Sequence, residues 1–411
     1  MRRRVVVTGI GLVTPVGIGV EEAWENVVKG KSGIGPITRF DAKDFPVRIA
    51  AEVKDFEPQK FIEPKLIEEM DRFIQFAIAG SLIAIERTGL KGKLDSEKAG
   101  VIIGVGLGGL PSIEEQFTVL KERGYRRVSP YFIPMTIPNL AAGWVSILTG
   151  AKGVNLCIST ACSAGLHAVG EAYRYIRDGV IDIAICGGAE SAITPLAIAG
   201  FSSMKALSRR NDEPEKASRP FEKNRDGFVI GEGAGILVLE EYESAKKRGA
   251  EIFAEIIGYG ANGDAYHITS PPPEGKGAEE CMRLAIKDAG ISVEEVQYIN
   301  AHGTSTKLND LYETIAIKKL FKNHAKNLFV SSTKSVTGHT LGAAGGIEAA
   351  FTALSLKTGV IPPTINYEEP DPECDLNYVP NKPIELKELK YALCNSFGFG
   401  GTNACIVFKK L

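Results

Sequence analysis

Short apolar runs bounded by glycine or polar residues recur along the whole 411-residue chain. Such runs, rich in β-branched residues, are typical of buried strands. We predict strands at 4–7, 100–105, 153–158, 181–186, 235–240, 252–258, 298–301, 328–332 and 405–408. Between them, helical spacing of apolar residues predicts helices at 70–88, 166–177, 278–289, 310–321 and 345–357. This alternation of strands and helices predicts an α/β fold.

A short sequence pattern occurs twice, 180 residues apart. An Ala-Gly pair at 164–165 precedes a Gly-Val-Ile triplet at 179–181, and both recur in the second half of the chain with the same spacing. Ala and Gly are common here, so the repeat is a weak signal by itself, but it suggests two similar halves. We place their boundary near residue 250, which gives domains 1–250 and 251–411. No proline-rich linker separates them, so we expect the halves to pack tightly.

Composition is that of a globular protein, with 44% apolar and 24% charged residues, which argues against extended disorder and a coiled-coil rod. The 48 basic and 50 acidic side chains nearly cancel, so nothing favours binding of nucleic acid over the whole surface. No run of about 18 apolar residues is present, so we expect no membrane span. The basic start at 1–7 is followed by glycines and polar residues, so we expect no signal peptide.

The seven cysteines contain no CxxC pair and lie mostly in apolar runs. This pattern indicates neither a zinc site nor a disulfide framework. We therefore expect no metal ligands among these cysteines and a reducing compartment, the cytoplasm.

Cys162 lies where the strand predicted at 153–158 turns into the helix predicted at 166–177. The dipole and free amides of a helix N-terminus stabilise an anion there, and can lower a thiol pKa from about 8.5 into the range of about 3.5 to 7.5. This placement predicts a reactive thiolate. The alternative is a small buried cysteine that fills a tight turn, which is our interpretation of Cys157 and Cys186 inside apolar strands.

Two of the five histidines, His302 and His339, follow predicted strands in turns that contain glycine and hydroxyl groups. The carboxyl ends of strands form the edge at which open α/β sheets bind ligands. A cysteine and two neutral imidazoles at this edge indicate acyl-thioester chemistry, in which the imidazoles donate hydrogen bonds to an oxyanion or enolate. Taken singly, each histidine is as consistent with a structural role. We expect His167, His267 and His324 to be structural or solvent-facing.

Three further features accompany these residues. Lys334 and Glu348 flank His339 and can pair to tune the imidazoles, with a surface ion pair as the alternative. The segment at 395–403 has three glycines and two aromatic residues, so its amides can approach a ligand closely, unless it is a plain hairpin turn. The segment at 205–226 holds twelve charged residues in 22 positions and is either a solvated loop or a mobile cover over a site.

The run at 104–109 matches the dinucleotide-binding pattern GxGxxG after a predicted strand. The match is a weak signal, because we expect Pro111 to interrupt the helix that should follow, and no clear acidic residue ends a strand about 20 residues later. A nicotinamide-dependent oxidoreductase is therefore a minor alternative.

Motifs spread over essentially the whole chain are specific in combination. They are RVVVTG at 4–9, TAC at 160–162, SRPF at 218–221, RDGF at 225–228, NAHGTST at 300–306, KSVTGH at 334–339 and NSFGFGGTN at 395–403. Together they resemble the β-ketoacyl-[acyl-carrier-protein] synthases, elongating condensing enzymes, and most closely the type II members of bacterial fatty-acid synthesis. The resemblance implies the thiolase fold, two similar α/β halves with a five-layered α-β-α-β-α core, usually as a homodimer. It implies decarboxylative condensation of malonyl-acyl-carrier-protein with an enzyme-bound acyl group.

The resemblance also implies roles for individual residues. Cys162 is the nucleophile, and its amide forms the oxyanion hole with that of Phe399, which also gates the acyl pocket. His302 and His339 hold the malonyl thioester, and Lys334 and Glu348 organise them. The substrate-binding residues carried over are Thr304 and Thr306 for the phosphopantetheine arm, with Leu107, Phe397 and Gly400.

Three positions depart from or refine the family pattern. Lys307 stands where a proline usually follows Thr306, which puts the detail of that loop in doubt. Leu107 resembles the bulkier pocket-floor residue of the type II enzymes. His339 separates the chain from the initiating synthases, which have an asparagine there, so an acyl-carrier primer is favoured over acyl-CoA.

The implied partner is an acidic acyl carrier protein, so a local basic patch is expected despite the net charge of -2. The candidates are Lys65, Arg126, Arg127 and Lys205, with ordinary solvated side chains as the alternative. The resemblance implies no cofactor, and leaves open a monovalent cation near Asn300, Glu348 and Asn395.

Two other functions stay open. A catalytically silent partner of the same fold needs none of Cys162, His302 and His339, so these three residues argue against it. A thiolase that condenses acyl-CoA without decarboxylation is separated by comparing malonyl-carrier protein with acetyl-CoA.

Overall fold

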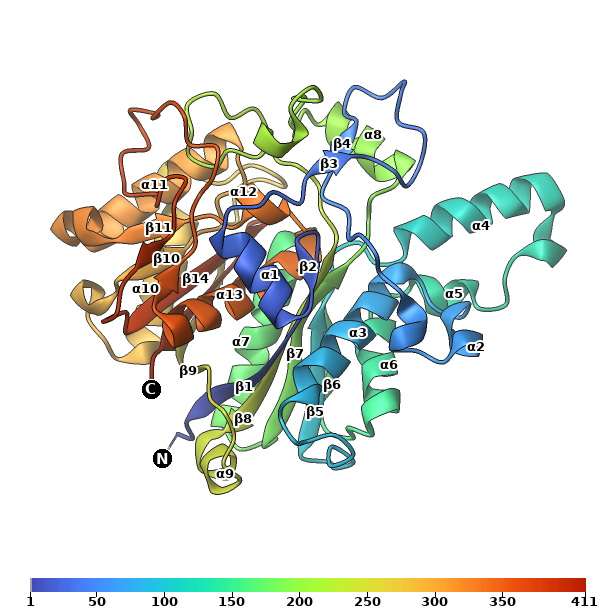
Figure 1. Ribbon diagram of the computed structural model, residues 1–411, viewed down its shortest axis with the longest axis horizontal. Coiled ribbons are helices and arrows are strands. Elements are labelled where there is room, and N and C mark those ends of the chain that lie inside the picture. Colours follow the sequence, from blue (N-terminus) through green and yellow to red (C-terminus); the bar gives the residue numbers. More distant parts are fainter. Residues whose placement is uncertain (1) are drawn as a thin grey trace.

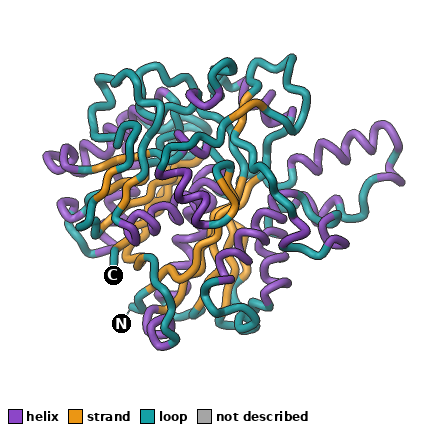
Figure 2. Tube along the Cα trace, in the orientation of Figure 1, coloured by secondary structure: helices purple, strands orange, loops and turns teal. Residues whose placement is uncertain are grey.

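The computed structural model describes residues 2–411, with the strands in a central block and the helices between and around them (Figures 1 and 2). The strands are β1 (Val5–Thr14), β2 (Gly17–Ile18), β3 (Gly35–Pro36), β4 (Ile49–Ala50), β5 (Ala99–Gly104), β6 (Asn155–Ile158), β7 (Ile183–Glu190), β8 (Gly233–Glu241), β9 (Ala254–Gly263), β10 (Tyr298–Asn300), β11 (Phe329–Ser331), β12 (Val360–Ile361), β13 (Ile384–Glu385), β14 (Tyr391–Gly398) and β15 (Thr402–Lys409). The helices are α1 (Val20–Val28), α2 (Pro64–Ile67), α3 (Arg72–Glu86), α4 (Leu110–Arg123), α5 (Phe132–Thr136), α6 (Leu140–Thr149), α7 (Ala164–Arg177), α8 (Pro195–Ser203), α9 (Tyr242–Lys247), α10 (Lys276–Ala289), α11 (Lys307–Phe321), α12 (Lys334–Thr337) and α13 (Ala344–Thr358). Across residues 2–411, no helix is both long and apolar enough to cross a membrane.

The large sheet has the same strand order in both halves of the chain. The first half runs β6-β5-β7-β8-β1 and the second runs β11-β10-β14-β15-β9, and the two meet where β1 pairs with β9. In each half the first three strands of this order are parallel, and the two remaining pairings are antiparallel. The duplicated halves are therefore confirmed, while a domain boundary at residue 250 stays a prediction.

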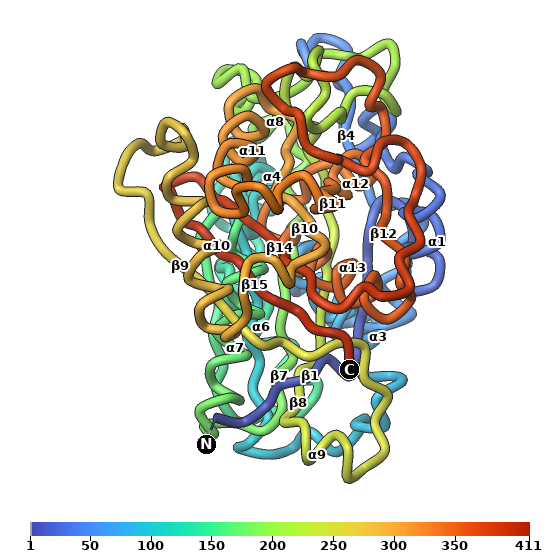
Figure 3. The backbone as a smooth tube through the Cα atoms, turned by 90° about the vertical axis from the view of Figure 1, so that its left-hand side faces the viewer, coloured from blue at the N-terminus to red at the C-terminus, as the bar shows by residue number. Residues whose placement is uncertain are grey.

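Helices α7 and α13 fill the layer between the two half-sheets. The α7 helix packs on β5 and β7, α13 packs on β8 and β14, and the two helices pack on each other. The α3 helix covers the first half-sheet from outside, and α10, with α11 beside it, covers the second (Figure 3). This arrangement confirms the five-layered α-β-α-β-α core. Because α13 lies between two sheets, 13 of its 15 residues are buried.

The β1 strand extends to Thr14, well beyond the predicted end at residue 7. Its glycines resemble strand breakers in the sequence, but here they let α3 approach the sheet closely. A Cβ on Gly9 would lie 2.3 Å from the carbonyl oxygen of Ala84, and a Cβ on Gly11 would lie 1.9 Å from that of Gly80. Glycine inside a strand can mark such a close approach of another backbone.

Three other expectations from the sequence are wrong in detail. The β6 strand lies at the sheet edge and its four residues are exposed or half-buried, so the segment at 153–158 is not a buried strand. Pro111 does not interrupt a helix, because it lies in the first turn of α4, where a missing amide hydrogen costs no hydrogen bond. The β14 strand was not predicted, and it pairs with β15 in a hairpin, so the segment at 395–403 is mostly strand with a turn at its tip.

Candidate active site

Cys162 lies in a single turn of 3-10 helix between β6 and the start of α7. The preceding residue, Ala161, has a φ of 52°, in the left-handed region that residues with a side chain rarely adopt. A matching turn precedes α13 in the second half, where Leu341 has a φ of 51°. These two turns are the local structure behind the repeat at 180 residues. The second turn carries Gly342 at the position that corresponds to Cys162.

The β14–β15 hairpin is fastened to the Cys162 turn by side-chain hydrogen bonds. Ser396 Oγ donates to the carbonyl oxygen of Cys162 at 3.0 Å, and Thr402 Oγ1 donates to that of Thr160 at 2.9 Å. The amides of Phe399 and of Cys162 itself lie toward the Cys162 sulfur and favour its anionic form. Two amides at this sulfur are also placed to donate to an oxyanion on a carbon bonded to it.

Burial raises the pKa of Cys162 to about 11, although the charge of Lys334 and the amide of Phe399 act in the opposite direction. The lowered pKa expected from the helix N-terminus is therefore wrong, because burying the thiolate raises its pKa by more than Lys334 and the two amides lower it. The resting side chain is a thiol, and its proton must pass to a base when the sulfur attacks.

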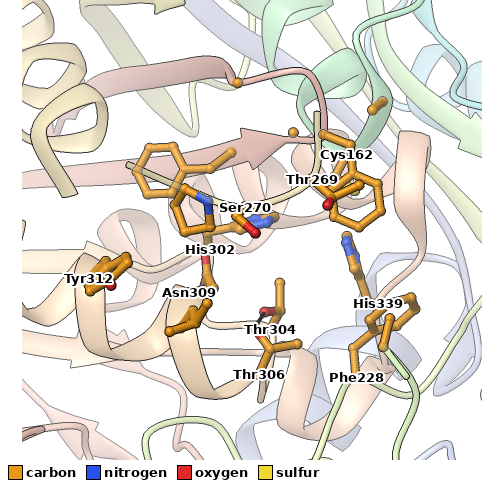
Figure 4. A pocket seen from close by; sticks show the side chains of 18 of the residues that line it. Cys162, Phe228, Thr269, Ser270, His302, Thr304, Thr306, Asn309, Tyr312 and His339 are labelled. Carbon is orange, nitrogen blue, oxygen red and sulfur yellow. Dashed lines mark hydrogen bonds between the residues drawn. The ribbon is translucent and has the colours of Figure 1, made fainter. Parts of the chain in front are cut away.

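His302 follows β10 and His339 follows α12, and their ring centroids lie 5.4 Å apart with the rings at 86°. Both rings line the same cavity as Cys162 (Figure 4). Burial lowers the pKa of both imidazoles well below the usual 6.5, and the positive charge of Lys334 adds to this effect. Both imidazoles are therefore neutral near pH 7, and each has one N–H to donate.

Lys334 and Glu348 form a buried ion pair, with their side chains 1% and 3% exposed. Lys334 Nζ also lies 3.4 Å from His302 Nδ1, which assigns the proton of the neutral His302 ring to Nε2. Burial raises the pKa of Glu348 to about 7, and Lys334 opposes this shift. The alternative of a surface ion pair is therefore wrong.

Glu313 on α11 holds the backbone of the His302 loop, a contact that sequence reasoning missed. Its carboxylate accepts hydrogen bonds from the amides of His302 at 2.9 Å and Gly303 at 2.8 Å. Asn395 Nδ2 donates to it at 3.1 Å. The only signal in the sequence is an acidic residue inside the helix that follows the NAHGTST motif.

The predicted residues meet in a cavity of about 580 Å³. Those that line it are Leu107, Cys162, Lys205, His302, Thr304, Thr306, His339, Phe397 and Phe399. The hydroxyls of Thr304 and Thr306 are 2.9 Å apart. Gly400 is not among the lining residues, and its amide donates to the carbonyl oxygen of Ile268 at 2.7 Å. Three of the four basic candidates lie outside this cavity, namely Lys65, Arg126 and Arg127.

The charged segment at 205–226 is fastened to the site. Its residues Arg219 and Arg225 are buried, so the interpretation as a solvated loop is wrong for this part. The Arg225 guanidinium donates to the carbonyl oxygens of Thr306 at 3.1 Å and Lys307 at 2.9 Å. The segment therefore holds the loop that carries the two threonine hydroxyls.

The glycine-rich run at 104–109 already binds an anion of its own chain. The carboxylate of Glu190 accepts hydrogen bonds from the amides of Gly106, Leu107 and Gly108. These amides are the groups that would otherwise hold a pyrophosphate, so the geometry does not support the dinucleotide alternative.

Three buried oxygens near the histidines have no hydrogen-bond partner: Asn300 Oδ1, Glu348 Oε2 and Asn395 Oδ1. Within residues 2–411, no group of three or more His, Cys, Asp or Glu side chains is arranged to hold a metal ion.

Models of the β-ketoacyl synthase N-terminal and C-terminal domains match residues 2–245 and 253–368. The 3-oxoacyl-[acyl-carrier-protein] synthase 2 of Synechocystis sp. is 53% identical over 410 residues, which cover 100% of this chain and 98% of that protein. The protein of the same name from Coxiella burnetii is 52% identical over 411 residues, which cover 100% of this chain and 99% of that protein. Among solved structures, the ishigamide ketosynthase/chain length factor has a TM-score of 0.93 at 37% identity, with 100% of both chains covered. The structure of a type II PKS acyl-carrier protein in complex with its ketosynthase bound to the hexaketide has a TM-score of 0.91 at 38% identity, also with 100% of both chains covered.

The fold and the site define a condensing enzyme of the thiolase-like class, built from two similar halves around one cysteine and two histidines. Within that class, the chain belongs to the β-ketoacyl synthase family, which confirms the resemblance carried by its motifs.

Proposed function

We propose that this chain condenses malonyl-acyl-carrier-protein, with loss of carbon dioxide, with an acyl group held on Cys162, and so yields 3-oxoacyl-acyl-carrier-protein in fatty-acid elongation. One observation carries the proposal: a single cavity holds a cysteine with two amides at its sulfur and two buried, neutral imidazoles. The names of relatives identical over half of their positions support the same reaction.

In the first half-reaction, the Cys162 sulfur attacks the carbonyl carbon of an acyl thioester and its proton passes to a neutral imidazole. The amides of Cys162 and Phe399 donate to the oxyanion that forms. Loss of one such donor typically costs about 100- to 1000-fold in rate. Collapse of the intermediate breaks the bond to the carrier sulfur, which takes up the proton, and the acyl group stays on Cys162.

In the second half-reaction, His302 and His339 donate N–H groups to the thioester carbonyl oxygen of the malonyl carrier. The bond to the carboxylate carbon breaks, carbon dioxide leaves, and the electron pair forms an enolate whose oxygen both donors stabilise. The enolate carbon attacks the acyl carbon on Cys162. Collapse breaks the bond to the Cys162 sulfur and releases the 3-oxoacyl carrier, and the Cys162 thiolate takes up a proton from solvent.

The remaining lining residues bind the substrate in this proposal. The hydroxyls of Thr304 and Thr306 face the cavity, where they can donate to the amides of the phosphopantetheine arm. Leu107 and Phe397 line the acyl pocket, and Phe399 at the hairpin tip gates it. Gly400 forms the turn at this tip, because its φ of 84° lies in the region that favours glycine.

The first test is mass spectrometry of the protein after mixing with an acyl-carrier thioester and then with malonyl-carrier protein. The proposal expects an acyl mass on Cys162 that disappears in the chase and yields a β-keto product two carbons longer. Cys162→Ala is the control and should take up no acyl group. A stable adduct would indicate a transferase, discharge by acetyl-CoA alone would indicate a thiolase, and no adduct on folded, reduced protein would indicate a silent partner.

A monovalent cation bound by Asn300, Glu348 and Asn395 belongs to this proposal. The three unpartnered oxygens are buried, and oxygen ligands suit hard cations. Replacing potassium and sodium by a bulky organic cation at constant ionic strength should lower the melting temperature of the protein. The variant Asn300→Ala should lose this dependence, whereas equal melting in all salts would argue against a bound ion.

In this proposal the partner is an acyl carrier protein, which the complex of the related ketosynthase supports, and it docks on four basic side chains of this chain. Lys205 lies at the cavity mouth, Lys65 is exposed beside Glu63, and Arg126 and Arg127 follow the projecting α4 helix (Figure 1). Charge reversal at Arg126 and Arg127 should raise the carrier KM and weaken its dependence on salt.

The matched control for the docking test is Lys247→Glu on α9, at the far end of the molecule from α4 (Figure 1). An unchanged carrier KM after reversal of both arginines would remove them from the docking surface.

Two further parts of the proposal concern the assembly and its compartment. A homodimer is supported by exposed apolar side chains that gather on α4, α5, α6 and the edge strand β6, namely Ile113, Phe117, Leu120, Ile133, Ile147, Leu148 and Leu156. Light scattering on the purified protein measures the oligomeric state directly. Seven unpaired cysteines support a reducing compartment, the cytoplasm.

A further inference from the structure

Glu190 is the last residue of β7 and is fully buried, yet no step of the proposed reaction uses it. Its carboxylate accepts hydrogen bonds from four backbone amides: Gly106 at 2.8 Å, Leu107 at 3.1 Å, Gly108 at 3.1 Å and Gly342 at 3.2 Å. Burial raises the pKa of Glu190 to about 7, and these amides act in the opposite direction. Such a buried, amide-bound carboxylate fixes the backbone that donates to it.

Three of the four donors are glycines, and two of these leave space for the carboxylate. A Cβ on Gly106 would lie 2.4 Å from Glu190 Oε2, and a Cβ on Gly342 would lie 2.8 Å from the same oxygen. A side chain at either position would push the carboxylate away. This contact therefore explains the glycine at position 106 of the glycine-rich run.

The amides held by Glu190 belong to two loops that carry apolar side chains of the cavity. Leu107 stands between two of the donor glycines, and Leu341 immediately precedes Gly342. Both leucines line the cavity, one from each half of the chain. The position of the carboxylate therefore determines where these two side chains stand relative to Cys162.

We propose that Glu190 is a positioning residue for acyl-chain length: by holding Leu107 and Leu341 in the cavity wall, it sets which aliphatic acyl groups Cys162 accepts. The inference rests on the proposed condensing function. Glu190 itself lines the cavity and its charge adds to the raised pKa of Cys162, but in this proposal its effect on chain length passes through the two leucines.

The experiment measures the rate of Cys162 acylation for carrier thioesters from about 4 to about 16 carbons in length, since a hydrophobic pocket resolves single methylenes by about 10- to 200-fold. Glu190→Gln keeps the size of the side chain but turns an NH₂ group toward backbone N–H donors, so the loop must move. The ratio of the rates for long and short chains should change by roughly tenfold. The KM for malonyl-carrier protein should stay unchanged.

The matched control is Glu52→Gln. Glu52 is also buried and also accepts hydrogen bonds from backbone amides, those of Thr38 at 2.8 Å and Arg39 at 3.2 Å, but it does not line the cavity. A purely structural role for Glu190 predicts the same change of chain-length ratio in both variants, or in neither. Either result would overturn the inference.

Leu107→Ala tests the same idea at a side chain that is 45% exposed and therefore tolerant of truncation. It should change the chain-length ratio, and adding Glu190→Gln to it should change the ratio less than Glu190→Gln does alone, because only the part that acts through Leu341 remains. An unchanged ratio in Leu107→Ala overturns the inference even if Glu190→Gln does not fold. Glu190→Asp, which keeps the charge, provides a second variant at that position.

The acylation and condensation readouts separate this inference from the proposed function. Acylation that depends on chain length and on Glu190, without discharge by malonyl-carrier protein, supports the inference and overturns the condensing function. Condensation with an unchanged chain-length ratio in Glu190→Gln does the opposite. No acylation at any chain length overturns both.

Discussion

At the residue scale, the ionisable groups around Cys162 have protonation states that free side chains in water would not have. The cysteine pKa is raised to about 11 and both histidine pKa values are lowered, in each case chiefly by burial. The site therefore begins with a protonated nucleophile and two neutral donors. Neutral imidazoles suit the second half-reaction, because burying a charged imidazole costs free energy that would offset its stabilisation of the enolate.

Alkylation of Cys162 by iodoacetamide should report its pKa. With a pKa of about 11, the thiolate fraction, and hence the rate, should rise about tenfold per pH unit between about pH 7 and 10. Peptide mass spectrometry follows Cys162 separately from the other cysteines. A rate that levels off below about pH 8 would show that the amides outweigh burial after all.

The charge of Lys334 should be visible in the pH dependence of decarboxylation. Lys334→Met removes a charge that lowers the pKa of His302 and His339, so both values should move up toward 6.5. On acidification the rate should then begin to fall at a higher pH than in the unaltered protein, because burial alone lowers the two pKa values less than burial and Lys334 together.

The control for this prediction addresses the ion pair itself. Removing one partner of a buried pair costs about 3 to 5 kcal/mol, and Glu348 would be left alone. The double variant Lys334→Met with Glu348→Leu removes both charges and should recover much of that stability in urea unfolding, while keeping the shifted pH profile. Superimposable profiles for all three proteins would exclude the electrostatic role of Lys334.

At the element scale, the β14–β15 hairpin brings the amide of Phe399 to the cysteine. Thr402 is the anchor, because its hydroxyl bonds the Thr160 carbonyl at 2.9 Å and lies 2.9 Å from Ser163 Oγ. Thr402→Val should lower the free energy of unfolding by about 0.5 to 1.5 kcal/mol, since it removes one hydrogen bond while Ser163 Oγ still donates to the Thr160 carbonyl at 2.8 Å. It should also slow acylation of Cys162, because the hairpin carries one of the two oxyanion donors.

Thr358→Val at the end of α13 is the matched control. The Thr358 hydroxyl donates to the Leu354 carbonyl at 2.8 Å, and Thr358 does not line the cavity. Stopped-flow acylation and urea unfolding of both variants give the comparison. Equal acylation rates in the two variants would show that the hairpin does not need this anchor.

The sequence predicted the elements whose signal is local. The helix periods at 166–177 and 345–357 lie within α7 and α13, because an apolar stripe needs no knowledge of its partner. The motifs also identified the groups that meet in the cavity, including Cys162, His302 and His339.

What the sequence could not show depends on contacts between distant segments. In the sequence, Gly9 and Gly11 indicate the end of a strand, and only the structure shows that they let α3 pack closely on it. The pKa of Cys162 depends on burial by loops from both halves, and local reasoning saw only the helix end. Glu190 and Arg225 look like an ordinary strand end and an ordinary charged loop until their backbone partners are in place.

At the scale of the whole molecule, the two halves share one interior. The α13 helix comes from the second half but packs on β8 of the first, and β1 and β9 join the half-sheets. Residues 1–250 and 251–411 made as separate chains should therefore not unfold cooperatively, because each exposes the face that the other covers. Circular dichroism during urea unfolding checks this, and a cooperative transition in either fragment alone would show an independent domain.

The repeated turn has a consequence for the stoichiometry of the reaction. The fold builds the same anion-holding turn twice, before α7 and before α13, and the second copy has Gly342 where the first has Cys162. That second copy is permanently occupied, since the Glu190 carboxylate accepts its amide. The two turns are similar in backbone but differ in what they bind. The second turn binds the chain's own carboxylate, so each chain can hold at most one acyl group, on Cys162 in the first turn.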